Sequence, residues 1–201
     1  MKVMKMKKTV NAFIIATTLV VAPTANADYI ASVGFAPIGG DDLVETSGED
    51  LEAGAGIYGD IGILHQPAGS ALSYQATFGL KLNFVEFEGG DADITSLPLN
   101  FMMFYNNDSN LRFGAGVTYE LSPEYILNAS SGFSNSNVEF DDAVGFAIEA
   151  GYFLNEKAFL GVRYTALDYD MPSGQALIHS NGNVVSSIDA NNLGIHIGIM
   201  F

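Results

Sequence analysis

The chain has 201 residues, and its 23 acidic residues far outnumber its 8 lysines and arginines, which gives a formal net charge of −15. Such a chain is not expected to bind nucleic acid, because phosphate groups repel an acidic surface. It contains no cysteine, which excludes disulfides, thiol chemistry and cysteine-ligated metal sites.

The N-terminal residues have the three parts of a secretory signal peptide. Four lysines lie within the first eight residues, an apolar segment spans residues 12–22, and an Ala-Asn-Ala cleavage pattern ends at Ala27. The apolar segment is too short for a transmembrane helix, which needs about 20 apolar residues. We therefore predict a signal peptide over residues 1–27 and a single domain over residues 28–201.

Eight segments of the mature chain alternate apolar side chains with small or polar ones, which is the period-two pattern of a β-strand with one apolar face. In chain order they cover residues 29–36, 51–64, 72–84, 97–105, 111–121, 144–152, 160–166 and 193–201. In the second segment, the pattern assigns Ala53 and Ala55 to the outward apolar face. An even number of alternating strands is typical of a bacterial transmembrane barrel.

The connections between these segments alternate in length. Residues 66–70, 106–110 and 155–157 form short polar turns, whereas residues 37–50, 86–93, 120–142 and 168–189 form long segments. Short periplasmic turns and long extracellular loops are typical of such barrels. In the last long segment, Asn181-Gly182 favours a tight turn and predicts a protruding hairpin, with a bulge at Pro172 and Gly174.

The C-terminal segment carries the most specific signal. Leu193, Ile195, Ile197, Ile199 and Phe201 alternate with small or polar residues. A soluble sandwich would expose this strand as an edge, whereas a barrel pairs it with the first strand. With the signal peptide and the eight alternations, this ending resembles the small outer-membrane β-barrels of the OmpA transmembrane domain and OmpX type. We predict an all-β, eight-stranded antiparallel up-and-down transmembrane β-barrel in the outer membrane.

The resemblance implies how such a protein is assembled and what surrounds it. The five alternating residues of the last strand would be the assembly signal read by the barrel-assembly machinery. Outer-membrane lipids and lipopolysaccharide would surround the barrel. The chain ends at the barrel, so the peptidoglycan-binding domain of full-length OmpA is not expected. We predict a monomer without a cofactor.

Most of the bases after the signal peptide fall at inward positions of the predicted strands. The inward titratable residues are Asp60, Lys81, Arg112, Glu149, Arg163 and His196. A turn centred on Glu156 would place Glu149 directly opposite Arg163. Such a buried pair either gates a pore or fixes a closed interior, because a buried charge without a partner costs several kcal/mol.

The long segments contain 17 of the 23 acids, Glu120 among them, and neither lysine nor arginine. Carboxylates bind divalent cations such as Ca²⁺ and Mg²⁺, and an acidic surface attracts a cationic partner. The spacing matches no defined cation-binding loop, and the same composition also serves solubility. Lipopolysaccharide is anionic, so these loops would reach it only through bridging cations.

The three histidines form no recognisable catalytic motif. His179 and Ser180 with Asp189 supply the residue types of a hydrolase triad, but a hairpin tip offers no rigid oxyanion site. We therefore expect no enzyme, and two functions remain open. The first is a surface barrel that supports the envelope or binds partners through its acidic loops, and the second is a narrow diffusion channel for small solutes. Eight strands leave an interior only wide enough for side chains, which favours the first.

Overall fold

The computed structural model describes residues 27–45, 50–87, 90–129, 135–173, 177–178 and 184–201. All of the predicted signal peptide except Ala27, and the predicted Asn181-Gly182 turn, lie outside these residues. Within the described ranges, no helix is long and apolar enough to cross a membrane.

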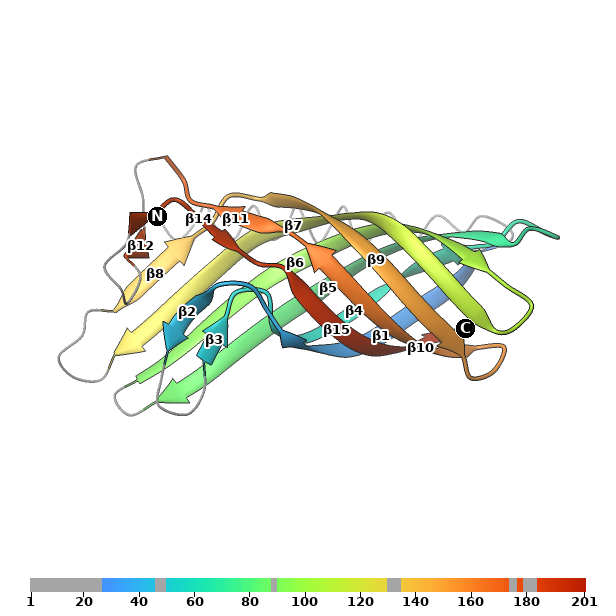
Figure 1. Ribbon diagram of the computed structural model, residues 1–201, viewed down its shortest axis with the longest axis horizontal. Coiled ribbons are helices and arrows are strands. Elements are labelled where there is room, and N and C mark those ends of the chain that lie inside the picture. The colour runs from blue at the N-terminus through green and yellow to red at the C-terminus, as the bar shows by residue number, and fades with distance from the viewer. Residues whose placement is uncertain (1–26, 46–49, 88–89, 130–134, 174–176, 179–183) are drawn as a thin grey trace.

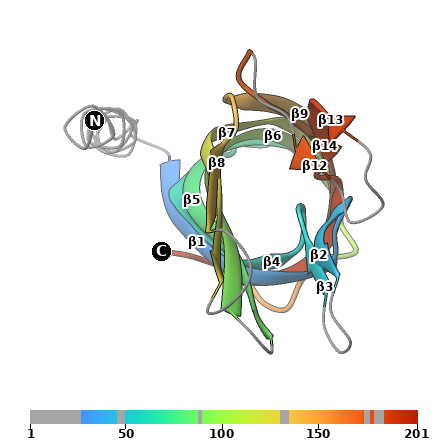
Figure 2. The same cartoon turned by 90° about the vertical axis from the view of Figure 1, so that its left-hand side faces the viewer.

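Eight long antiparallel strands close into a barrel (Figure 1). They are β1 (Ala27–Ile38), β4 (Gly56–His65), β5 (Leu72–Phe87), β6 (Gly90–Asn106), β7 (Leu111–Ala129), β9 (Ala143–Phe153), β10 (Ala158–Ala166) and β15 (Asn192–Met200). Each strand pairs with its neighbours in this order, and β15 pairs with β1 to close the ring, which is seen end-on in Figure 2. The predicted fold class is confirmed.

The first and last strands meet at a well-paired seam. Gly34 lies opposite His196, and the pairing extends to the terminal residue, because the backbones of Tyr29 and Phe201 exchange two hydrogen bonds of 3.0 Å. Their rings stack with centroids 6.0 Å apart. The terminal aromatic residue therefore takes part in closing the barrel.

Apolar side chains cover the outside of the barrel. Val33 is 56% exposed and Ile148 is 59% exposed, and the other large outward side chains of the eight strands are similar. A band of this size would be unstable in water, whereas a transmembrane barrel places such a band against lipid. We call this band the membrane belt.

Three barrel strands extend beyond the belt on the extracellular side. Much of the segments over residues 86–93 and 120–142, predicted as loops, belongs to β5, β6 and β7, and β8 (Ser136–Glu139) pairs with the end of β7. In β7, Ser122 has a φ of 48°, and its N–H donates to the carboxylate of Asp142 at 2.9 Å. The register with β6 shifts at this bulge, so Tyr125 points inward although the inward residues below the bulge have even numbers.

The prediction for the second strand is wrong at its start. The strand begins at Gly56, and Ala53 and Ala55 are buried instead of facing outward. The preceding residues form a separate hairpin of β2 (Asp42–Glu45) and β3 (Asp50–Glu52), which also supplies Leu51 to the interior. The alternation fails here because this hairpin packs into the mouth of the barrel.

In the described residues, the last long segment pairs with itself as the predicted protruding hairpin does, in several short pieces. It contains β11 (Asp168–Asp170), β12 (Leu177–Ile178), β13 (Val184–Val185) and β14 (Ser187–Asp189). β11 pairs with β14, and β12 pairs with β13, in two small sheets separate from that of the barrel. Pro172 lies between β11 and β12, and Gly174 lies outside the described residues.

Buried apolar side chains from these hairpins and from the barrel wall fill the extracellular mouth. We call this group the mouth cluster. Its members are Leu51, Ala53, Val85, Ala92, Ile94, Tyr125, Phe140, Ala143, Leu167, Tyr169, Met171, Ile188 and Ala190.

Candidate functional site

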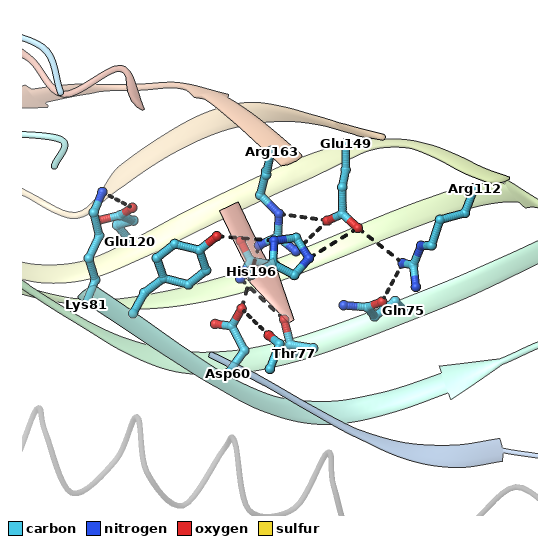
Figure 3. A network of polar contacts seen from close by, with 12 residues as sticks. Asp60, Gln75, Thr77, Lys81, Arg112, Glu120, Glu149, Arg163 and His196 are labelled. Carbon is cyan, nitrogen blue, oxygen red and sulfur yellow. Dashed lines mark hydrogen bonds and ion pairs between the residues drawn. The ribbon is translucent and has the colours of Figure 1, made fainter. Parts of the chain in front are cut away.

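The structure places all six predicted inward residues inside the barrel, where each is buried (Figure 3). Glu149 on β9 lies directly opposite Arg163 on β10, at the register position that the sequence predicts. Glycines in the wall leave space for the long side chains. At Gly151, an added Cβ would lie only 2.8 Å from the side chain of Arg112.

Glu149 is the centre of an inner charge cluster. One of its oxygens, Oε2, accepts hydrogen bonds from Arg163 Nη2 at 2.8 Å and Nε at 3.0 Å. Its other oxygen lies 3.6 Å from Arg112 Nη2 and 3.4 Å from His196 Nε2. Arg163 also lies 3.6 Å from Asp60. These five residues come from five strands, so the cluster ties the walls of the barrel together.

Aromatic rings close the barrel beneath this cluster. The guanidinium carbon of Arg112 lies 3.5 Å from the ring centroid of Phe104 and 4.2 Å from that of Phe159, a cation–π arrangement. Arg112 also donates to Gln75 at 3.0 Å. Phe159 packs with Ile30 and Leu64. These side chains fill the lumen directly beneath the inner charge cluster, and a cavity of about 470 Å³, lined by residues that include Ser73, Asn106 and Phe153, lies at the periplasmic end.

A second polar group lies nearer to the extracellular side, and its centre is Glu120. The assignment of Glu120 to a loop is wrong, because the structure buries it in the lumen on β7. Its carboxylate accepts hydrogen bonds from Ser96, at 2.5 Å, and from Tyr169, and lies 3.8 Å from Lys81. The even-numbered inward positions of this strand could have identified it, since Arg112 and Thr118 share them.

Tyr169 joins this group to the mouth cluster. Burial, with a smaller contribution from Glu120, raises the pKa of its hydroxyl well above the usual value. The hydroxyl therefore stays protonated and donates to the carboxylate.

A small polar cavity separates the two groups. Its volume is about 30 Å³, enough for about one water molecule. The residues that line it include Asp60, Lys81, Asn100, Thr118, Glu120 and Arg163. Among the described residues, the buried charges balance, with Asp60, Glu120 and Glu149 against Lys81, Arg112 and Arg163. The lumen therefore needs no bound ion for neutrality.

The extracellular end outside the lumen is acidic. After the predicted signal peptide, the four bases are Lys81, Arg112 and Arg163 in the lumen and Lys157 in a periplasmic turn. Several acidic residues lie directly opposite one another on paired strands. These cross-strand pairs include Asp42 with Glu52, Glu86 with Asp91, Glu124 with Glu139, and Asp168 with Asp189.

Asp93 on the extended part of β6 is partly buried and has acidic neighbours. Partial burial, with Asp91 and Glu124 nearby, raises the pKa of its carboxyl above the usual value. The part of the chain that the structure describes contains no group of three or more histidine or acidic side chains placed to hold a metal ion. Binding of divalent cations stays a prediction.

The histidines do not form a catalytic site in the described residues. His196 lies in the inner charge cluster, with its Nδ1 3.2 Å from the hydroxyl of Tyr58. His65 ends β4 at the periplasmic side of the barrel, whereas Asp189 ends β14 in the last extracellular segment. His179 and Ser180 lie outside the described residues.

Comparisons with known proteins find the same fold in solved structures. Neisserial surface protein A aligns over 87% of this chain and 97% of its own, with a TM-score of 0.51 and 12% identity. The attachment invasion locus protein Ail of Yersinia pestis, solved in complex with the heparin analogue sucrose octasulfate, aligns over 88% and 99%, with a TM-score of 0.57 and 7% identity. No protein-family model and no curated protein sequence matches the chain. The closed barrel and its apolar belt are thus the fold of the eight-stranded outer-membrane β-barrels, in agreement with the predicted location in the outer membrane.

Proposed function

We propose that this protein is a non-enzymatic outer-membrane barrel that does not conduct, and that it acts through its acidic extracellular end. The observation that carries the proposal is the filling of the lumen between its extracellular mouth and the cavity at its periplasmic end. The mouth cluster, the Glu120 group, the inner charge cluster and the aromatic rings around Arg112 follow one another from the extracellular to the periplasmic side. A solute would have to displace buried ion pairs, which is costly.

Single-channel recording tests the closed lumen. Refolded protein, checked for its heat-modifiable mobility in electrophoresis, is added to a planar bilayer in about 1 M salt. Surface charges are screened at this concentration. We expect no reproducible current above that of the bilayer with detergent alone. A stable, ion-selective conductance would support the narrow diffusion channel instead.

The extracellular end favours a cationic partner or a cationic surface. The Ail structure contains a sulfated, and therefore anionic, ligand. Such a ligand does not suit this chain, because the extracellular segments carry acids and no lysine or arginine. Support of the envelope or interaction at the cell surface would then depend on charge attraction, which falls as salt screens it.

Charge neutralisation tests this second half of the proposal. We expect cells or vesicles with the triple variant Asp42→Asn, Asp168→Asn and Asp170→Asn to bind an immobilised lysine-rich peptide less than wild type at low salt. The matched control neutralises the acids Asp28, Asp108 and Glu156 near the periplasmic end. Equal binding by both variants would contradict a role for the extracellular acids.

A further inference from the structure

The cavity of about 470 Å³ at the periplasmic end of the lumen is large enough to hold a small molecule. Small-molecule sites typically have volumes of about 300–1,000 Å³. Asn155 and Glu156, in the turn between β9 and β10, line the cavity and are exposed, so it opens to the periplasm. The aromatic rings around Arg112 close its other end. We call this cavity the periplasmic pocket.

The inner end of the periplasmic pocket is apolar. Leu64 of β4 is buried in a small apolar cluster, and Phe153 of β9 and Met200 of β15 pack against that cluster. All three residues line the pocket. The rings of Phe153 and Phe159 meet edge to face, with centroids 6.0 Å apart. This end of the pocket can therefore bury the methylene groups of a ligand, and an aromatic ring also attracts a cation.

Asn106 of β6 supplies a hydrogen-bond acceptor to the pocket. Its Nδ2 donates to the hydroxyl of Ser73 at 3.0 Å, and both residues line the pocket. Its Oδ1 is buried and has no hydrogen-bond partner among the described residues. A buried acceptor without a partner is costly. Water can satisfy this oxygen, and a ligand with an N–H group can replace that water.

The charged side chains that line the pocket are acidic. They are Asp28 of β1 and Glu156, and the described lining includes no lysine, arginine or histidine. Removal of the predicted signal peptide after Ala27 would add the α-amino group of Asp28 at this rim. One positive charge would then face two negative charges, so the rim would still attract a cation.

We propose that the periplasmic pocket binds a small organic cation with an apolar stem, such as an alkyl diamine. An ammonium group pairs with the carboxylates of Asp28 and Glu156, the stem contacts the apolar inner end, and an N–H group donates to Asn106 Oδ1. An anion is repelled by the rim, and a neutral solute lacks the charge that the rim favours. This site lies at the opposite end of the barrel from the acidic extracellular segments, and it goes beyond the proposed function.

Titration with 1,4-diaminobutane tests the pocket. Refolded protein without the predicted signal peptide, in zwitterionic detergent at low salt, is followed through the NMR signals of the backbone amides of Ser73 and Phe153, which line the pocket. We expect a saturable shift, and an affinity about tenfold lower or less for 1,4-butanediol, which has the same stem without the charge. No saturable shift, or equal binding of the diol, would overturn the proposal.

The rim is tested by Glu156→Gln. Removing one exposed carboxylate should lower the affinity for the diamine about two- to fivefold, as expected for an exposed ion pair. Asp108→Asn is the matched control, because Asp108 is an exposed acid in another periplasmic turn and does not line the pocket. It should leave the affinity unchanged. Equal losses in the two variants would mean that the general charge of the turns attracts the cation, which would overturn the pocket.

Two substitutions of Asn106 should change the affinity in opposite directions. Asn106→Leu removes the buried acceptor at similar volume and should lower the affinity about fivefold or more. Asn106→Asp adds a carboxylate and should raise the affinity. Both variants are first checked for heat-modifiable mobility, which shows that the barrel is folded. An unchanged affinity in both would overturn the proposed site.

A last pair of measurements separates this site from the acidic extracellular end. The triple variant Asp42→Asn, Asp168→Asn and Asp170→Asn should bind the diamine as wild type does, and Glu156→Gln should still bind the lysine-rich peptide. Loss of diamine binding in the triple variant would place the diamine at the extracellular end. That result would overturn the periplasmic site and leave the proposed function standing.

Discussion

Strand β6 passes through two regions in which the polar and apolar faces of the strand are exchanged. In the membrane belt, Phe101 faces outward and Asn100 faces the lumen, whereas near the extracellular end Asp93 faces outward and Ile94 faces inward. The parity of the inward positions is the same in both places. The surroundings explain the reversal, because lipid favours apolar side chains outside and water favours them inside. A single strand can therefore belong to a polar core and to an apolar core.

Removing a charge from the lumen, at the level of the membrane belt, should have the largest effect on stability. Glu149→Leu leaves Arg163 and Arg112 buried without their carboxylate, so we expect a loss of about 3–5 kcal/mol in the free energy of unfolding. Adding Arg163→Met should recover part of this loss. Urea titration of the refolded barrel in lipid vesicles measures each step of this double-mutant cycle.

The acid Glu86 at the extracellular end provides the control for this cycle. It is exposed, so Glu86→Gln should change stability by less than about 0.5 kcal/mol. If the cycle showed no coupling between Glu149 and Arg163, their ion pair would not contribute to the stability of the barrel.

The next effect concerns the lipid face of the belt. Ile148→Arg should cost about 2–4 kcal/mol in a bilayer, because it places a charge against the hydrocarbon. Val144→Arg on the same face of β9 lies at the extracellular end of the strand, where the cost should fall to about 1 kcal/mol or less. Equal costs at the two positions would mean that the belt is misplaced along the strand.

The terminal aromatic residue should matter more in the cell than in refolding experiments. Phe201→Ala removes a local contribution of only about 1.5–3 kcal/mol. If the terminal residue is read during assembly, the amount of folded barrel in the outer membrane should fall severalfold. Tyr152→Ala, another exposed aromatic substitution near the periplasmic end, is the control. Equal amounts of folded barrel for the two variants would mean that Phe201 has no special role in assembly.

The smallest effect concerns the partly buried carboxyl group of Asp93 at the extracellular end. The raised pKa of Asp93 means that the folded form binds its proton more tightly than the unfolded chain does. This contribution to stability is present at low pH and is lost as the pH rises through the raised pKa, above the ordinary value of about 4. Asp93→Asn should therefore reduce the pH dependence of hydrogen exchange in the extended parts of β6 and β7. If the pH dependence were unchanged, groups other than Asp93 would be its cause.

Period-two alternation predicted the belt well, because only one face of each strand there meets lipid. The eight strands, their order and the inward positions of Lys81, Arg112 and Arg163 follow from that pattern alone. The position of Glu149 opposite Arg163 follows from the short turn, since a tight turn leaves little freedom of register.

The sequence by itself therefore determined a closed barrel with an apolar exterior and a charged interior. Only the tertiary structure decided how the extracellular end is built. Ala53 lies inside because a hairpin folds into the mouth, and Tyr125 points inward because of the bulge at Ser122. Glu120 meets Tyr169 although 49 residues separate them in the chain. The physical reason is that local periodicity reports which side of a strand is buried, whereas contacts between distant segments depend on how the loops pack together.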